Sequence, residues 1–348
     1  MNPIRVLVVD DSAVMRGIMT QVINAQPDMT VAAVASDPLV AMERLRTARP
    51  DVIALDVEMP RMDGLEFLAK LMHWRPLPVV MVSSLTARGA DTTLRALELG
   101  AVDFVAKSPI TTAEDFDAYA AEITDKLRAA AAARVARKPL AASPRQPVKT
   151  RLARATDLTT GNRLVVIGAS TGGVEALREV LTPLPAEMPP ILVAQHMPAG
   201  FTRSFAQRLD GMCEIDVKEA EDGEPLRRGR AYIAPGGMHL VVGGRGGRLE
   251  ARLSLEPPVN RHRPSVDTLF RSAALAAGER CIGVMLSGMG ADGAEAMSEL
   301  RRCGAHNIAQ DEASCVVFGM PKQAIALNAV HDVLPLRDIP RRLAELSQ

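Results

Sequence analysis

The chain has 348 residues, of which 47% are hydrophobic and 3% aromatic, and it carries 41 basic and 41 acidic residues. This length predicts two domains, with enough apolar material for two cores. The zero net charge excludes a strongly basic nucleic-acid-binding protein and an acidic disordered chain. Because aromatic stacking platforms are scarce, we expect no nucleic-acid partner.

The sequence also indicates where the protein works. One short apolar run is followed at once by Asp10 and Asp11, which is not the pattern of a secretion signal, and no apolar stretch reaches the roughly 18 residues that span a bilayer. Four cysteines lie in or beside apolar runs without metal-type CxxC spacing, at Cys213, Cys281, Cys303 and Cys315. They are typical of buried, reduced thiols. We therefore expect a cytoplasmic protein with no membrane insertion.

Residues 1–127 alternate short β-branched runs with amphipathic stretches. The runs predict strands at residues 4–9, 31–35, 52–55, 79–82 and 102–106, with helices between them. These strands are apolar almost throughout, as in a parallel sheet covered on both faces, so we expect a doubly wound α/β domain. In such sheets the reactive groups lie at the carboxyl ends of the strands.

Polar residues follow four of these five strands, namely Asp10 and Asp11, Asp56, Ser83 and Lys107. Three converging carboxylates repel one another unless a hard cation lies among them, and oxygen ligands suit Mg²⁺. Asp56 could then attack a phosphorus atom, while Mg²⁺, Lys107 and Ser83 offset charge on the transferred oxygens. A single aspartate at a strand end is usually a turn or cap residue, so the prediction depends on the ordered set.

The segments VLVVDDS, LDVEMPRMDG, VSS and FVAK resemble the receiver domain of two-component response regulators across residues 1–127. The resemblance implies a flavodoxin-like fold, phosphorylation by a histidine kinase, and functional positions at Asp56 (phosphorylation), Asp10 and Asp11 (Mg²⁺, with Asp56), Ser83 (switch hydroxyl), Lys107 (phosphate sensing) and Phe104 (aromatic switch partner). Phe104 lacks the hydroxyl that some receivers carry at this position.

Residues 128–160 have a different composition, with eight basic residues and one acidic residue, a net charge of +7. An Ala-rich helical start gives way to Pro139, Pro144 and Pro147, and the segment contains too little apolar area to fold alone. We expect a flexible linker. It is either a solvated tether or a segment that docks on an acidic surface.

The third segment, residues 161–348, opens with a buried strand that runs through glycines into a helix and matches GxSxG at Gly168, Ser170 and Gly172. A sharp turn of this kind projects the serine hydroxyl and leaves helix-start N–H groups for an oxyanion. The alternative is a phosphate-binding dinucleotide turn, which predicts an acidic residue about 20 positions further on. The next strand ends instead in Gln195 and His196.

These strand ends predict a nucleophile, Ser170, and a general base, His196. Asp292 follows a later strand and glycine turn, and qualifies as the group that orients the imidazole. The order Ser, His, Asp differs from that of α/β-hydrolases, so that fold is not assumed. Considered singly, Ser170 and Asp292 would more often be helix N-cap residues, and Asp292 could form a capping box with Glu295. Two other histidines compete for the role of base, His239 and His262, whereas His73, His306 and His331 look peripheral.

Several long motifs in this segment resemble the catalytic domain of the chemotaxis-specific protein-glutamate methylesterases, the CheB family. They are GASTGG, QHMPAGFTRSFAQRLD, APGGMHL, RHRPSVDTLF, LSGMGADGAEAM and QDEASCVVFGMPKQAI. The resemblance implies a Rossmann-like three-layer α/β/α domain with Ser170 as nucleophile, His196 as base, Asp292 as orienting acid, and Met289 and Thr171 as oxyanion-hole or supporting positions. Ala296 and Asn328 stand where the family often has glycine.

The combined prediction is a phosphorylation-activated serine hydrolase that demethylates glutamate methyl esters and deamidates glutamines on chemoreceptors. The resemblance further implies that the unphosphorylated receiver covers the catalytic mouth, that Mg²⁺ serves only the receiver, and that the esterase chemistry needs no cofactor. A catalytically silent receptor-binding adaptor, a DNA-binding response regulator and a nucleotide-binding module are the alternatives.

Overall fold

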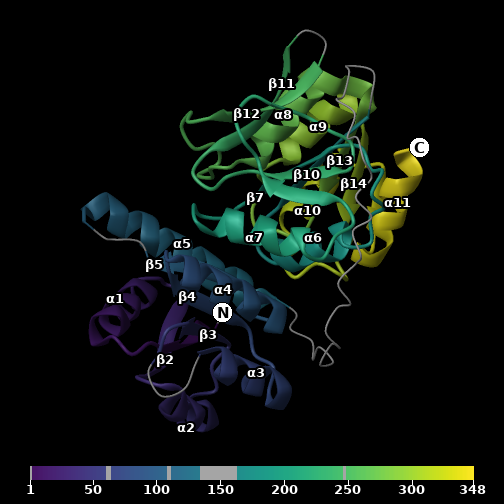
Figure 1. The fold of residues 1–348 in the computed structure, drawn as a ribbon. Coiled ribbons are helices and arrows are strands. Elements are labelled where there is room, and N and C mark those ends of the chain that lie inside the picture. The colour runs from purple at the N-terminus through teal and green to yellow at the C-terminus, as the bar shows by residue number, and fades with distance from the viewer. Residues whose placement is uncertain (1, 60–63, 108–110, 134–162, 246–247) are drawn as a thin grey trace. The chain divides into compact units, whose positions relative to one another are not determined.

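The computed structural model describes residues 2–59, 64–107, 111–133, 163–245 and 248–348 (Figure 1). The chain divides into two compact units, Met1–Ala142 and Ser143–Gln348. Most of the expected linker lies outside the described residues. Its Ala-rich start is the end of a long helix, α5 (Ala113–Ala132), as the sequence predicts.

The first unit is a five-stranded parallel sheet in the order β2-β1-β3-β4-β5. Its strands are β1 (Ile4–Val9), β2 (Met29–Ala35), β3 (Val52–Asp56), β4 (Val79–Ser84) and β5 (Asp103–Lys107). The helices α1 (Ala13–Asn24), α2 (Pro38–Ala48), α3 (Gly64–Trp74) and α4 (Ala87–Leu99) alternate with them. This order is flavodoxin-like and confirms the predicted class. The strand positions agree with the prediction to within two residues.

Local sequence explains why these helices begin just beyond the sheet edge. The side chains of Ser12, Asp37, Thr86 and Thr112 each accept a hydrogen bond from a first-turn N–H group, which caps α1, α2, α4 and α5. The strands between them are buried, with Val6, Leu7 and Val8 fully inaccessible. The polar residues at the strand ends are therefore left at one edge of an apolar sheet.

The second unit has a seven-stranded parallel sheet in the order β15-β14-β13-β6-β7-β10-β8. The strands are β6 (Leu164–Ala169), β7 (Ile191–Gln195), β8 (Asp216–Glu219), β10 (Arg230–Ile233), β13 (Cys281–Met285), β14 (His306–Gln310) and β15 (Asp332–Leu334). The first of these, β6, lies between β7 and β13, so the chain winds outward in both directions from it. Ligand sites in such sheets form at this switch point.

Helices cover both faces of this sheet, as in the expected three-layer domain. One apolar cluster joins α8 (Val266–Ala277), α9 (Ala294–Arg302) and α10 (Met320–Ala326) to it. Figure 1 shows α6 (Gly173–Leu181) and α7 (Phe201–Asp210) on the opposite face from α8 and α9. The C-terminal helix α11 (Ile339–Leu346) contacts α6.

One part of the second unit was not predicted. It is a small antiparallel sheet of β9 (Glu224–Pro225), β11 (His239–Arg245) and β12 (Arg248–Ser254). Another difference concerns the cysteines, which are all free thiols: Cys213, Cys281 and Cys315 are buried as expected, but Cys303 is exposed. Asn328, at a position where the family often has glycine, has a left-handed backbone with φ +53°.

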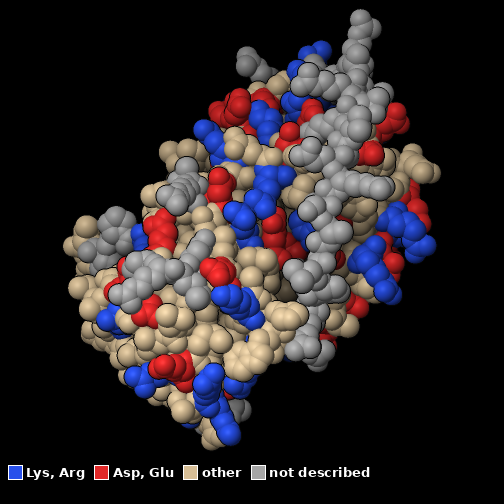
Figure 2. Space-filling view, turned by 60° about the horizontal axis from the view of Figure 1, so that its bottom comes forward, with Lys and Arg blue, Asp and Glu red and all other residues tan. Residues whose placement is uncertain are grey.

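The described surface fits the balanced charge of the sequence. Figure 2 shows basic and acidic side chains interspersed on one face. Within the described ranges, no helix combines the length and the apolar character needed to cross a bilayer.

Candidate active site

Ser170 directly follows β6, in a turn that a side chain at either flanking glycine would obstruct. A Cβ at Gly168 would lie 2.3 Å from Val266 Cγ1, and Gly172 has φ +77° and is the N-cap residue of α6. The Ser170 N–H donates to Ser287 O at 3.0 Å, which ties this turn to the chain after β13. Ser170 is therefore not the helix cap that a lone serine would have been.

Folding brings together the three residues predicted as a triad. His196 Nδ1 lies 3.1 Å from Ser170 Oγ, and His196 Nε2 lies 2.8 Å from Asp292 Oδ2. Both distances are within hydrogen-bond range. Since a carboxylate only accepts, the hydrogen is on Nε2, and Nδ1 is left with the lone pair that faces the serine hydroxyl.

The Asp292 carboxylate is buried and saturated with donors. Oδ2 also accepts from the Val266 N–H at 2.6 Å, and Oδ1 accepts from Asn260 Nδ2 and Ser265 Oγ, both at 2.8 Å. Burial alone would raise the pKa of Asp292, but the hydrogen bonds it accepts and its electrostatic attraction to His196 outweigh burial and hold that pKa well below its ordinary value. The N-cap of α9 is Gly293, so Asp292 is not a helix cap.

The two competing histidines lie near the site but in other roles. The ring of His262 stacks on that of His196, with centroids 3.7 Å apart and planes 12° apart. His239 is fully buried, and its Nε2 donates to Pro257 O at 3.1 Å. Its Nδ1 accepts from the Ser265 N–H at 3.2 Å. His239 therefore supports the segment that surrounds Asp292, whereas His196 makes the hydrogen bond to the serine.

Residues 287–290 form the turn that contains Met289. Ser287, which is fully buried, donates its hydroxyl to Thr171 O at 2.8 Å and accepts from the Val317 N–H at 3.0 Å. The Gly288 N–H donates to Val317 O at 3.1 Å, and Gly288 O accepts from Met320 N at 2.8 Å. These bonds fix the turn that carries the Met289 N–H beside the nucleophile turn that carries Thr171.

Asn260 was not predicted from the sequence, and its loss should be measurable. It has φ +51°, and its amide donates to Asp292 Oδ1 and to Asp267 Oδ2 at 2.7 Å. Asn260→Gly permits the same backbone but removes the amide, so we expect kcat to fall by about 10- to 100-fold, the scale of a hydrogen bond to a charged group. Steady-state kinetics of the hydrolysis that the sequence predicts would measure this fall in kcat. Asn328→Gly, at the other left-handed asparagine of this unit, is the matched control and should retain wild-type kcat.

At the carboxyl edge of the first sheet, Lys107 Nζ lies 2.9 Å from Asp10 Oδ2 and 2.8 Å from Asp56 Oδ2. Carboxylate oxygens of Asp10, Asp11 and Asp56 lie within 4.8 Å of one another. Three carboxylates this close repel one another, and an all-oxygen donor set fits a hard cation such as Mg²⁺. These residues therefore fit the predicted metal site.

Burial raises the pKa of Asp56 to about 6, although Lys107 acts in the opposite direction. Burial would lower the pKa of Lys107, but its contacts with Asp56 and Asp10 outweigh this and raise it. Ser83 is buried at the end of β4, with its hydroxyl 3.3 Å from Gly89 O. Phe104 is buried on β5 below the ammonium of Lys126, which lies 5.1 Å from the ring centroid.

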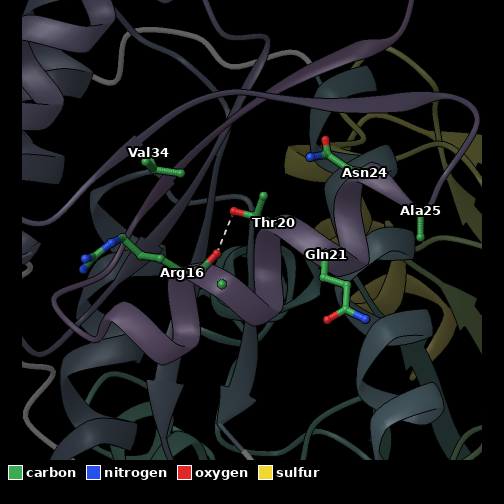
Figure 3. A pocket seen from close by; sticks show the side chains of 7 residues that line it. Arg16, Thr20, Gln21, Asn24, Ala25 and Val34 are labelled. Atoms are coloured by element: carbon green, nitrogen blue, oxygen red, sulfur yellow. Dashed lines mark hydrogen bonds between the residues drawn. The ribbon is translucent and has the colours of Figure 1, made fainter.

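A shallow hollow of about 620 Å³ lies along α1 and reaches Val34 on β2 (Figure 3). In it Thr20 Oγ1 donates to Arg16 O at 2.7 Å. The guanidinium of Arg16 donates to Asp10 O at 2.8 Å and to Asp11 O at 3.0 Å. Arg16, which lines the hollow, thus contacts the backbone of Asp10 and Asp11, two of the three predicted Mg²⁺ ligands.

Comparisons with known proteins identify the family of the chain. The family model described as CheB methylesterase matches residues 165–343, and the response regulator receiver domain matches residues 6–115. A protein-glutamate methylesterase/protein-glutamine glutaminase from Burkholderia lata is 58% identical over 98% of this chain and 94% of its own. The chain belongs to the CheB methylesterase family.

Other CheB proteins support this assignment. A Thiobacillus denitrificans protein named protein-glutamate methylesterase/protein-glutamine glutaminase is 56% identical over 98% of this chain and 96% of its own. The crystal structure of the Thermotoga maritima CheB methylesterase catalytic domain has a TM-score of 0.52 and 44% identity, and the match covers 53% of this chain and 98% of that chain.

Sequence reasoning missed the residues that support the triad. Asn260 and Ser265, just before α8, and Asp267, in its first turn, surround Asp292, and Ser287 joins two turns. The only signal was that Ser265 and Asp267 lie in the motif RHRPSVD, which Asn260 directly precedes, and that Ser287 lies in LSGMG. Nothing in the spacing of those motifs indicates which carboxylate they contact.

Proposed function

We propose that this CheB family member is a phosphorylation-activated serine hydrolase whose Ser170, His196 and Asp292 remove methyl esters from chemoreceptor glutamates and deamidate glutamines. The double activity itself follows from family membership, since relatives 56–58% identical over nearly the full length are named for it. The observation that supports the triad is the unbroken contact from Ser170 Oγ through His196 to Asp292.

In the first half of the reaction, Ser170 Oγ attacks the side-chain carbonyl carbon of the substrate while its proton moves to His196 Nδ1. Asp292 stabilises the imidazolium through Nε2, the reverse of the ring orientation in the familiar serine protease triad. His196 then gives the proton to the leaving group, methanol from an ester or ammonia from an amide. Water, activated by the same nitrogen, releases glutamate from the acyl-enzyme.

The tetrahedral intermediates need N–H donors for their oxyanion. We assign this role to the Met289 N–H, with the Thr171 backbone in support, because these two turns adjoin the nucleophile and are held together by Ser287. Ester and amide substrates pass through the same oxyanion, so one site can serve both activities.

The receiver would be phosphorylated on Asp56 by a chemotaxis histidine kinase. Asp10, Asp11 and Asp56 would hold Mg²⁺, which supplies charge neutralisation on the transferred phosphoryl oxygens. Lys107 adds a fixed positive charge at the same point. We further propose that residues 1–127 and 161–348 are separate domains joined by a linker at 128–160, and that the protein acts in the cytoplasm. We also propose that the unphosphorylated receiver inhibits the esterase domain through a direct contact, which phosphorylation weakens. To change the ratio of active to inhibited protein from 1:99 to 99:1, phosphorylation must stabilise the active state by about 5.5 kcal/mol relative to the inhibited one.

Release of radiolabelled methanol from methylated receptor membranes, with and without acetyl phosphate and Mg²⁺, tests this function. We expect phosphodonor to accelerate the wild type but not Asp56→Asn, which retains the basal rate because it leaves the triad intact. Asp51→Asn, an exposed residue just before β3, should respond like the wild type. Acceleration of Asp56→Asn would refute gating through Asp56, and absence of methanol release from the wild type would refute the hydrolase.

A further inference from the structure

Gln195 is a buried polar residue in the esterase unit to which the mechanism above assigns no role. It is the last residue of β7, is 3% exposed, and immediately precedes the base His196. Its Nε2 donates to Ser170 O at 3.0 Å and to His196 O at 3.2 Å. Its Oε1 is buried and accepts no hydrogen bond from the part of the chain that the structure describes.

Chemistry fixes the orientation of this side-chain amide. Both groups that face it are backbone carbonyl oxygens, which only accept, so the nitrogen with its two hydrogens must point toward them. Oε1 then lies against the first residue of α6, where a Cβ at Gly173 would be 2.1 Å from it. The last glycine of GASTGG, Gly173, is therefore required next to this glutamine.

The two carbonyls belong to the nucleophile and the base, at the point where their strands separate. The last backbone bond between β6 and β7 joins the His196 N–H to Ala169 O at 3.1 Å. Beyond it, Ser170 enters the turn into α6 and His196 enters the loop before α7. The Gln195 amide spans the two strands one residue further, so the separation of Ser170 from His196 depends on it.

The same contact orients a neighbouring peptide group. Ser170 O also accepts from the Gly173 N–H at 2.7 Å, so this carbonyl is held from two sides. In a planar trans peptide the N–H of the next residue points opposite to the carbonyl, so the direction of the Thr171 N–H is fixed as well.

We propose that Gln195 is a positioning residue for the hydrolysis reaction. It sets the approach of the Ser170 hydroxyl to His196 and the direction of the Thr171 N–H. This role rests on the proposed triad. What distinguishes Gln195 from another buried amide is that its two carbonyl partners belong to Ser170 and His196.

The test compares Gln195→Met, which has similar length but no donor, with a matched structural control. Asn307, in β14, is a fully buried amide whose Nδ2 also bridges two carbonyls, Met297 O and Ala329 O at 2.8 Å, and whose Oδ1 has no partner among the described residues. Asn307→Leu loses the same kind of contacts away from the triad. Thermal unfolding, kcat and KM for methanol release, and the rate of Ser170 labelling by a fluorophosphonate are measured for each.

We expect both variants to lower Tm, because each loses two hydrogen bonds to buried carbonyls, but only Gln195→Met to lower kcat and the labelling rate, by about 10- to 100-fold with little change in KM. In Asn307→Leu, kcat should stay within about twofold of wild type. In Gln195→Glu a carboxylate faces the two carbonyls, and protonation restores one donor, so its kcat relative to wild type should rise as pH falls. Wild-type kcat in Gln195→Met, or an equal loss of kcat in both variants, would overturn the proposal. Ser170→Ala in the same assay separates this failure from failure of the triad, because turnover within tenfold of wild type there would refute the proposed function itself.

Discussion

Replacing Ser170 by alanine should lower kcat for methanol release by about 10⁴-fold or more, because it removes the proposed nucleophile. The hydroxyl lies 3.1 Å from His196 Nδ1, and alanine leaves that nitrogen with no nucleophile to activate. The change removes one oxygen from a turn whose backbone bonds remain, so Tm should hardly change. Methylated receptor membranes and rapid filtration of the released methanol provide the measurement.

The matched control for this prediction is Ser204→Ala on α7, which removes a hydroxyl outside the proposed triad. It should retain wild-type kcat. Mass spectrometry after fluorophosphonate treatment should find one adduct, on the peptide containing Ser170, in the wild type and in the control. Turnover by Ser170→Ala within tenfold of wild type would favour the catalytically silent alternative for this site, with the measured activity arising elsewhere.

The parallel sheets could be predicted because the information lies in short local patterns. The apolar runs that become β1 and β6 end in Asp10 and Ser170, and a parallel sheet places all such ends at one edge. The same rule predicted that His196, at the end of β7, would lie close to Ser170. Strand ends thus determine which residues meet even though Ser170 and Asp292 are far apart in sequence.

What could not be predicted depends on contacts between segments without periodic patterns. The β11–β12 hairpin contains the sequence GGRGG, whose glycines indicate a loop rather than paired strands. Asn260 contacts Asp292 because a left-handed backbone turns its amide toward two buried carboxylates. The stacking of His262 on His196 likewise arises from the path of that loop. No spacing rule encodes either contact.

Asp292→Asn should reduce kcat by about 10⁴-fold, because an amide cannot satisfy donors on both sides. If the new NH₂ group faces His196, Nε2 must accept, the hydrogen moves to Nδ1, and Nδ1 can no longer take the proton of Ser170. If the NH₂ group instead takes the place of Oδ1, it faces the Asn260 amide, which is also a donor, so that hydrogen bond is lost. Asp222→Asn, a mostly exposed aspartate beside β12, should retain wild-type kcat. Retention of a tenth or more of wild-type kcat by Asp292→Asn would contradict the assignment.

The stability of the same variant should depend on pH in a direction set by Asp292. Because hydrogen bonds hold the pKa of Asp292 below that of the unfolded chain, the carboxylate stabilises the fold above the unfolded value of about 3.9, and this contribution is lost as pH falls toward the folded pKa. Asparagine does not titrate. Urea unfolding should therefore show the full difference between wild type and Asp292→Asn at pH 7 and a smaller difference near pH 3.5. A difference that grows on acidification would mean that the buried carboxylate is not held in its charged form.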